Sequence, residues 1–115
     1  MNLEKTARKY FQIFEDKDVD SLSAMFHEDI VLKDWNIQAE GKESVLKANI
    51  SIFESVESLN VCVDELHVSR WEGDKTVIAV LSITANGSDD ILPVVDIIKF
   101  NSEEEIISIT AFRGN

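Results

Sequence analysis

Asp96 is the one acid in an apolar stretch of β-strand type, residues 91–100 (ILPVVDIIKF). Because side chains alternate between the two faces of a strand, Asp96 shares its face with four apolar residues, Leu92, Val94, Ile98 and Phe100. Lys99 points to the opposite face and cannot pair with it. An ionised carboxylate in such surroundings costs on the order of several kcal/mol, so we expect Asp96 to have a partner or to hold a proton. A protonated carboxyl donates a hydrogen bond.

Two further polar groups are expected beside apolar surfaces. Asp34 ends a short predicted strand, and Tyr10 falls on the apolar face of the first predicted helix. Sparse polar groups on an apolar background are typical of small-molecule pockets, where few groups orient the ligand and many carbons bind it. Each residue also has an ordinary structural explanation. Asp96 could bond a nearby donor, Asp34 could cap loop amides, and Tyr10 could be a core tyrosine whose hydroxyl reaches solvent or a carbonyl.

Helical spacing predicts three helices that would position these groups. The first carries its apolar residues at helical intervals: Leu3, Ala7, Tyr10, Phe11 and Phe14. Asp18 is a plausible N-cap for a second, short helix with Val19, Leu22, Met25 and Phe26 directed inward. A short strand over 29–35 follows. The third helix begins after Gly41 and turns one face inward: Val45, Leu46, Asn49, Ile50 and Phe53.

The rest of the chain is predicted to be an antiparallel meander. Apolar runs over 58–71, 75–86, 90–100 and 104–113 are separated by the turn sequences EGD, GSDD and NSEE. Helices first and strands second predict an α+β domain, and the length favours a single domain over 1–115. In 76–85 both faces are largely apolar. Three helices can cover only one face of the sheet, so we expect a homodimer through its outer face.

Composition excludes several classes of partner. A net charge of −11 argues against nucleic acid and anionic membranes, which bind cationic surfaces. No apolar run approaches the roughly 20 residues that span a bilayer, and the N-terminus lacks the apolar block of a secretion signal. We therefore expect a cytoplasmic protein without membrane contact. The lone Cys62 allows no internal disulfide, and His27 and His67 do not have the spacing of metal ligands, so no metal site is predicted.

The stretch YFQIFEDKDVDSLSAMFHEDIVLKD, with the later VVDIIKFN and ITAFRG, resembles the ketosteroid isomerase branch of the nuclear transport factor 2-like superfamily. The resemblance covers almost the whole chain. It implies a cone-shaped fold in which three helices pack into a strongly curved, mainly antiparallel sheet around a deep pocket.

Three residues match the catalytic positions of the isomerases. Tyr10 precedes the acidic helix start DVD, Asp34 follows Phe26 by eight residues, and Asp96 precedes IIKFN. The resemblance implies that Asp34 is a general base and that Tyr10 and protonated Asp96 form an oxyanion hole; this arrangement is the standard example of a carboxylic acid kept neutral by an apolar site. The chain departs from the isomerases at Trp35, where they have proline, and a bulky indole there can narrow the pocket.

The implied function is cofactor-free proton transfer, an isomerisation of a small apolar ketone or enone. Three alternatives stay open: a non-catalytic binder of a small apolar molecule, a relative of the polyketide-cyclase-like hydrolases, cyclases and dehydratases, and a protein-interaction module. Because those cyclases commonly pair an acid with a histidine, His27 or His67 in the pocket would favour them. Residues of this kind are more often simple core than ligand contacts, and those expected to contact the ligand if the pocket is open are Trp35, Phe26, Phe53, Ile98 and Phe112.

Overall fold

A computed structural model describes residues 2–69 and 71–114; residue 70, within the strand expected over 58–71, lies outside this range. The elements follow in the order α1 (Leu3–Glu15), α2 (Val19–Met25), β1 (Phe26–Lys33), β2 (Gln38–Glu40), α3 (Lys42–Glu54), β3 (Leu59–Val68), β4 (Thr76–Ala85), β5 (Leu92–Phe100) and β6 (Ile106–Arg113).

The helices begin at polar or glycine caps. The Asn2 side chain accepts a hydrogen bond from the Lys5 amide at the start of α1, at 3.0 Å. Asp18 caps α2 as predicted, accepting from the Ser21 amide at 3.2 Å. Gly41 precedes α3 with a φ of 89°, a left-handed value that suits glycine. In the described part of the chain, no helix is long and apolar enough to cross a membrane.

The sheet corrects two sequence expectations. Phe26 was predicted to lie on the second helix, but α2 ends at Met25 and Phe26 begins β1. The strand β2 was not predicted, because only three residues, 38–40, pair along β1. The strand order is β2-β1-β6-β5-β4-β3, and β3 to β6 form the predicted antiparallel meander. The pairing of β1 with β6 is parallel, so the sheet is mixed.

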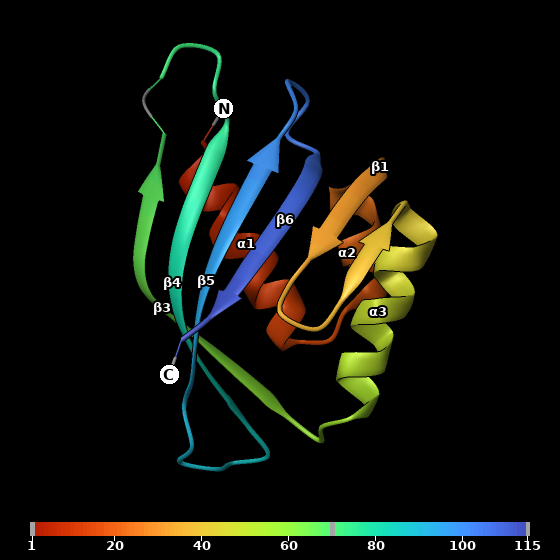
Figure 1. Cartoon of the computed structure of the whole chain (residues 1–115), viewed down its shortest axis with the longest axis vertical. Helices are drawn as coiled ribbons and strands as arrows, with labels where there is room; N and C mark the ends of the chain where they lie inside the picture. Colours follow the sequence, from red (N-terminus) through yellow and green to blue (C-terminus); the bar gives the residue numbers. More distant parts are fainter. Residues whose placement is uncertain (1, 70, 115) are drawn as a thin grey trace.

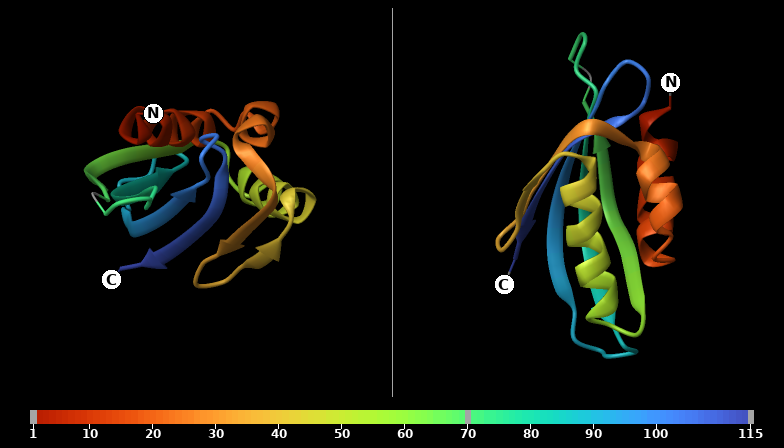
Figure 2. Two further views of the ribbon diagram at one scale, coloured as in Figure 1. Left: turned by 90° about the horizontal axis from the view of Figure 1, so that it is seen from above. Right: turned by 90° about the vertical axis from the view of Figure 1, so that its right-hand side faces the viewer.

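The helices cover one face of this sheet and leave the other without a helical layer (Figure 1). Helix α1 lies against β3 and β4, and α3 lies against β1 and β2. The short helix α2 packs against both α1 and α3. The view from above in Figure 2 shows the sheet curling around the helices. The predicted α+β class, with three helices against a strongly curved sheet, is confirmed.

Lys17 fastens the connection between α1 and α2 to the end of α3. Its Nζ atom donates hydrogen bonds to the carbonyl oxygens of Phe53, Val56 and Glu57, at 3.0, 2.5 and 3.0 Å. A cation at this position satisfies carbonyls left free at the helix C-terminus and is favoured by the helix dipole.

We expect Lys17→Met to lower the free energy of unfolding by about 1.5–3 kcal/mol, because hydrogen bonds from a charged donor are lost while the apolar stem is kept. Urea unfolding measures this change. The control is Lys47→Met, which removes an exposed lysine that pairs with Glu43 on the same helix at 3.4 Å and should change stability by less than about 0.5 kcal/mol. Equal effects of the two substitutions would contradict the role given to Lys17.

Candidate active site

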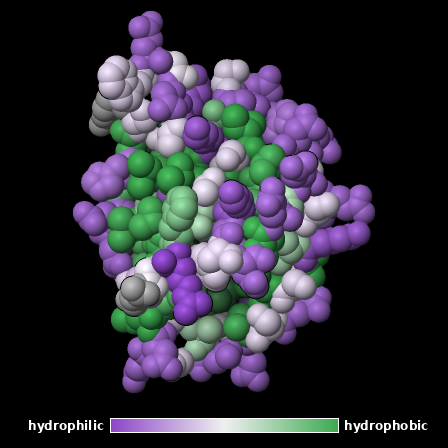
Figure 3. Space-filling view, in the orientation of Figure 1, coloured by the Kyte–Doolittle hydropathy of each residue, from purple (hydrophilic) through white to green (hydrophobic). Residues whose placement is uncertain are grey.

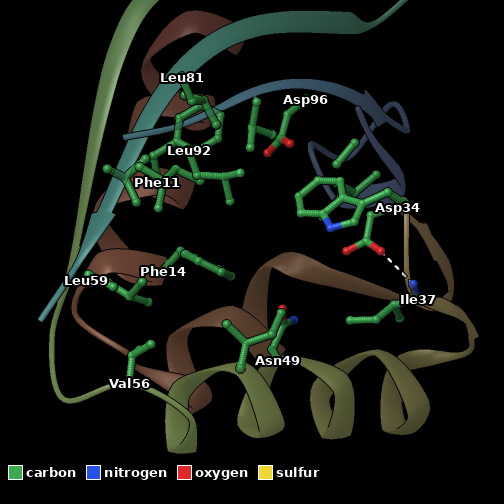
Figure 4. Close-up of a pocket in the computed structure, with 18 of the residues that line it drawn as sticks. Phe11, Phe14, Asp34, Ile37, Asn49, Val56, Leu59, Leu81, Leu92 and Asp96 are labelled. Atoms are coloured by element: carbon green, nitrogen blue, oxygen red, sulfur yellow. Dashed lines mark hydrogen bonds between the residues drawn. The ribbon is translucent and has the colours of Figure 1, made fainter. Parts of the chain in front are cut away.

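A cavity of about 380 Å³ lies between α1, α3 and the concave face of the sheet (Figure 4). Its size falls within the range of small-molecule sites, about 300–1,000 Å³. The helices α1 and α3 contribute to the lining, and so does every strand except β2. The described lining residues are Tyr10, Phe11, Phe14, Leu32, Asp34, Trp35, Asn36, Ile37, Asn49, Ile52, Val56, Leu59, Val61, Leu81, Ile83, Thr84, Ala85, Asp90, Leu92, Val94, Asp96, Ile109 and Ala111.

Asp96 enters the cavity from β5, as the strand alternation predicts. Its side chain is 8% exposed. The residues directly opposite it on the neighbouring strands are Ala79 and Ala111, whose short side chains leave room above the carboxyl. Burial, followed by the negative charge of Asp34, raises the pKa of Asp96 to about 7. Near neutral pH a large fraction of Asp96 is therefore protonated and can donate a hydrogen bond.

Tyr10 reaches the same cavity from α1. It is 5% exposed, and its ring packs against Phe11 and Phe26 with centroid separations of 5.2 and 6.4 Å. Burial, and secondarily the charge of Asp96, raise the pKa of the Tyr10 hydroxyl above its ordinary value. The phenol therefore remains neutral and able to donate a hydrogen bond.

Asp34 lies directly after β1 and is held by its own loop. Its Oδ1 atom accepts hydrogen bonds from the backbone amides of Asn36 and Ile37, at 2.7 and 2.6 Å. The Asp34 amide donates to the Ile37 carbonyl at 2.9 Å, closing the turn. The loop-capping role that the sequence left open is thus present. Because both side-chain bonds fall on Oδ1, they fix the carboxyl without engaging Oδ2.

The fold therefore brings Tyr10, Asp34 and Asp96 to one cavity from three separate elements. Figure 4 shows the Asp34 and Asp96 carboxyls entering from the sheet side, among apolar side chains. The charge of Asp34 contributes to the raised pKa of Asp96, and the charge of Asp96 contributes to the raised pKa of Tyr10. Such coupling makes it unfavourable for both acids to be ionised at once, which favours one carboxylate and one neutral acid.

The cavity opens between the β1–β2 loop and the loop that precedes β5. Trp35 lines it while remaining 47% exposed, and the exposed residues Asn36 and Asp90 line it as well. Trp35 thus lies at the mouth, where the sequence suggested that an indole would narrow access.

Four of the five predicted ligand contacts lie outside the described lining, which contains only Trp35 among them. Phe26 and Ile98 are buried in the core, where Phe26 packs behind Tyr10. Phe53 packs edge-on against Phe14, with ring centroids 5.0 Å apart, and does not reach the cavity. Phe112 is 57% exposed and pairs with Val95 on the outer face of the sheet. Alternation along β6 turns Ala111, not Phe112, toward the cavity.

Asn49 is a polar lining residue that sequence reasoning placed only on the inner face of the third helix. It is 3% exposed, and its Nδ2 atom is buried without a hydrogen-bond partner among the described residues. An unpaired buried donor costs about 1–3 kcal/mol. The sequence did contain a sign of this role, because Asn49 stands at a position of the helix where the helical spacing predicts an apolar residue.

The described lining contains no lysine, arginine or histidine, whereas it contains three acids, Asp34, Asp90 and Asp96. His27 and His67 both lie outside it. An anionic ligand group would therefore find no countercharge there.

Known structures share this fold at low sequence identity. A candidate dehydratase of the NTF2-like family from Streptomyces avermitilis superposes with a TM-score of 0.83 at 15% identity, covering 97% of this chain and 93% of that one. A candidate ketosteroid isomerase from Kribbella flavida gives 0.80 at 17%, covering 98% and 78%. A candidate polyketide cyclase from Sinorhizobium meliloti gives 0.79 at 16%, covering 93% of each chain.

These likenesses show the nuclear transport factor 2-like fold and, at such identities, nothing finer. No curated protein is significantly similar to the sequence. The model of the SnoaL-like domain matches residues 7–109, which is most of the chain and includes Tyr10, Asp34 and Asp96. The chain therefore belongs to the SnoaL-like domain family.

Proposed function

We propose that this domain is a cofactor-free proton-transfer enzyme that isomerises a small, uncharged, apolar ketone or enone. The observation that carries the proposal is the meeting of Asp34, Asp96 and Tyr10 in one largely apolar cavity. A partly exposed carboxylate beside a neutral buried acid and a neutral phenol supplies one base and two hydrogen-bond donors.

In the proposed reaction, Asp34 removes a proton from the carbon between the carbonyl group and the double bond of the substrate. The C–H electron pair moves into the conjugated system and gives a dienolate. Tyr10 and protonated Asp96 donate hydrogen bonds to the oxygen on which the charge develops. Asp34 then returns the same proton to the far carbon of the double bond, so the carboxylate is regenerated and no cofactor is consumed.

The test is an ultraviolet assay of conjugation with two β,γ-unsaturated ketones of different size, 3-cyclohexenone and 5-androstene-3,17-dione. Two sizes are needed because Trp35 lies at the mouth of the cavity. A titration with 2-naphthol, whose phenolate resembles the dienolate, measures binding separately. Turnover supports the isomerase. Tight binding of naphthol without turnover supports the non-catalytic binder, and failure of both measurements overturns the proposed site.

A histidine in the cavity would have favoured the cyclase alternative. Neither His27 nor His67 lies in the described lining, so no observation favours a cyclase. The binder alternative is favoured by one feature, the loop-capping role that Asp34 has through the two amides it bonds. Those bonds hold the carboxyl in place and occupy Oδ1, but Oδ2 is left to take the proton of a substrate.

We also propose that the domain forms a homodimer through the outer face of the sheet. Ile78 and Phe112 are 39% and 57% exposed on this face, with the partly exposed Val80, Val95 and Ile97 between them. Figure 3 shows hydrophobic side chains gathered over the part of this face that holds β4 and β5. Contiguous apolar surface of this kind is typical of protein interfaces.

If the outer face forms the dimer, Ile78→Glu should give a monomer, because it places a charge within the apolar surface. Light scattering coupled to size-exclusion chromatography distinguishes the two states. Ser51→Glu is the control, since it adds the same charge on the exposed side of α3 and should leave the dimer intact. A native protein that is already monomeric would refute this interface.

A further inference from the structure

Asn49 is a polar group that the proposed chemistry does not use. Asn49 is 3% exposed, and its buried Nδ2 atom has no hydrogen-bond partner in the described part of the chain. Buried polar groups in proteins nearly always have partners, and an exception calls for an explanation. Because Asn49 lines the cavity, a bound molecule is a candidate for the missing partner.

Asn49 and Asp96 lie on opposite sides of the cavity. Figure 4 shows the Asn49 amide rising from α3 into the cavity, while Asp96 enters from β5 on the far side. The side chains of Phe11, Phe14 and Leu92 lie along one side of the space between them. A ligand whose oxygen lies at Asp96 and Tyr10 would therefore extend past apolar carbon before it reached the amide.

We propose that Asn49 determines specificity by donating a hydrogen bond from Nδ2 to a second oxygen of the ligand, remote from the ketone. The ligand class is then an elongated apolar ketone or enone with an uncharged carbonyl, ether or hydroxyl oxygen at its other end. This inference rests on the proposed function, which puts the ketone oxygen at Tyr10 and Asp96.

The charges of the lining residues favour a neutral oxygen over a carboxylate as the acceptor of the Asn49 hydrogen bond. A carboxylate is also a hydrogen-bond acceptor, but Asp34, Asp90 and Asp96 share the lining, which offers no cationic side chain among its described residues. Desolvating an anion beside these acids is unfavourable, whereas a neutral oxygen pairs with the amide at no such cost.

The experiment compares the protein with Asn49→Leu, which has similar bulk and no donor. Two pairs of phenol probes of different length are titrated by fluorescence. Within each pair the probes differ only in that a remote CH2 group of one is a carbonyl group in the other: 6-ethyl-2-naphthol with 6-acetyl-2-naphthol, and 17-deoxyequilenin with equilenin. Asn60→Leu makes the same substitution at an exposed position outside the described lining and is the control. Thermal unfolding of each variant is measured alongside.

We expect Asn49→Leu to weaken binding of at least one two-oxygen probe by about 5- to 20-fold and to leave its one-oxygen partner unchanged. The melting temperature should not fall, because a donor without a partner is removed. If both two-oxygen probes bound Asn49→Leu as tightly as the native protein, or if the variant lost stability while binding all probes equally, the role of Asn49 would be overturned and the proposed function would stand. Absence of binding by every probe, in the native protein too, would overturn the proposed function together with this inference.

Discussion

Asp34→Asn should reduce the rate constant for proton transfer by about 100- to 10,000-fold, the usual contribution of a general base. Asparagine has nearly the same shape, and its Oδ1 can still accept the two amides of Asn36 and Ile37 that hold the side chain. The loop geometry is therefore kept while the basic group is removed. Turnover of the β,γ-unsaturated ketone that the native protein converts best is the measurement.

The control for this substitution is Asp89→Asn, which makes the same exchange at an exposed acid outside the described lining. It should leave both turnover and naphthol binding as in the native protein. Asp34→Asn should still bind naphthol, because the oxyanion donors remain. If turnover survived the loss of Asp34 within about threefold, another residue would have to be the base.

Asp96→Asn should stabilise the protein above pH 7 by about 4 kcal/mol relative to the native chain. The folded pKa of Asp96 is about 7, against an ordinary value of 3.8 in the unfolded chain. Between these pH values the folded state binds more protons than the unfolded state, so the Asp96 contribution to stability falls as pH rises, by about 1.4 kcal/mol per unit. It is fully present below pH 3.8 and fully lost above pH 7.

Urea unfolding at pH 4, 5, 6, 7 and 8 measures this dependence as the difference between variant and native protein, since carboxyls that do not interact with Asp96 contribute equally to both. The difference should grow from pH 4 to 7 and then stay constant. Parallel curves would show that Asp96 has an ordinary pKa in the folded state.

The same titration should appear in catalysis. The value of kcat/KM for the native protein should fall above about pH 7, as Asp96 loses the proton it donates. In Asp96→Asn the amide donates at every pH, so this decline should disappear. A decline that persisted unchanged in the variant would assign it to another group.

The sequence by itself determined the faces of the elements. Helical spacing placed Tyr10 on the inner side of α1, and strand alternation placed Asp96 among Val94 and Ile98, all of them buried. Asp18 marked the start of α2 by its capping chemistry. These features depend on residues within a turn or a strand of each other, so local periodicity is sufficient to predict them.

The tertiary structure decided where the cavity lies. Periodicity tells which face of an element is buried, but it does not tell whether a buried side chain meets another or an open space. The strand β2 has three residues, too few for a periodic pattern, yet the β1–β2 hairpin sets the loop that holds Asp34. Phe26, Phe53 and Ile98 were correctly expected to point inward, but they pack against other buried side chains and do not line the cavity. That the Asn49 amide has no partner among the described residues can be seen only in three dimensions, because it depends on all the elements around the side chain.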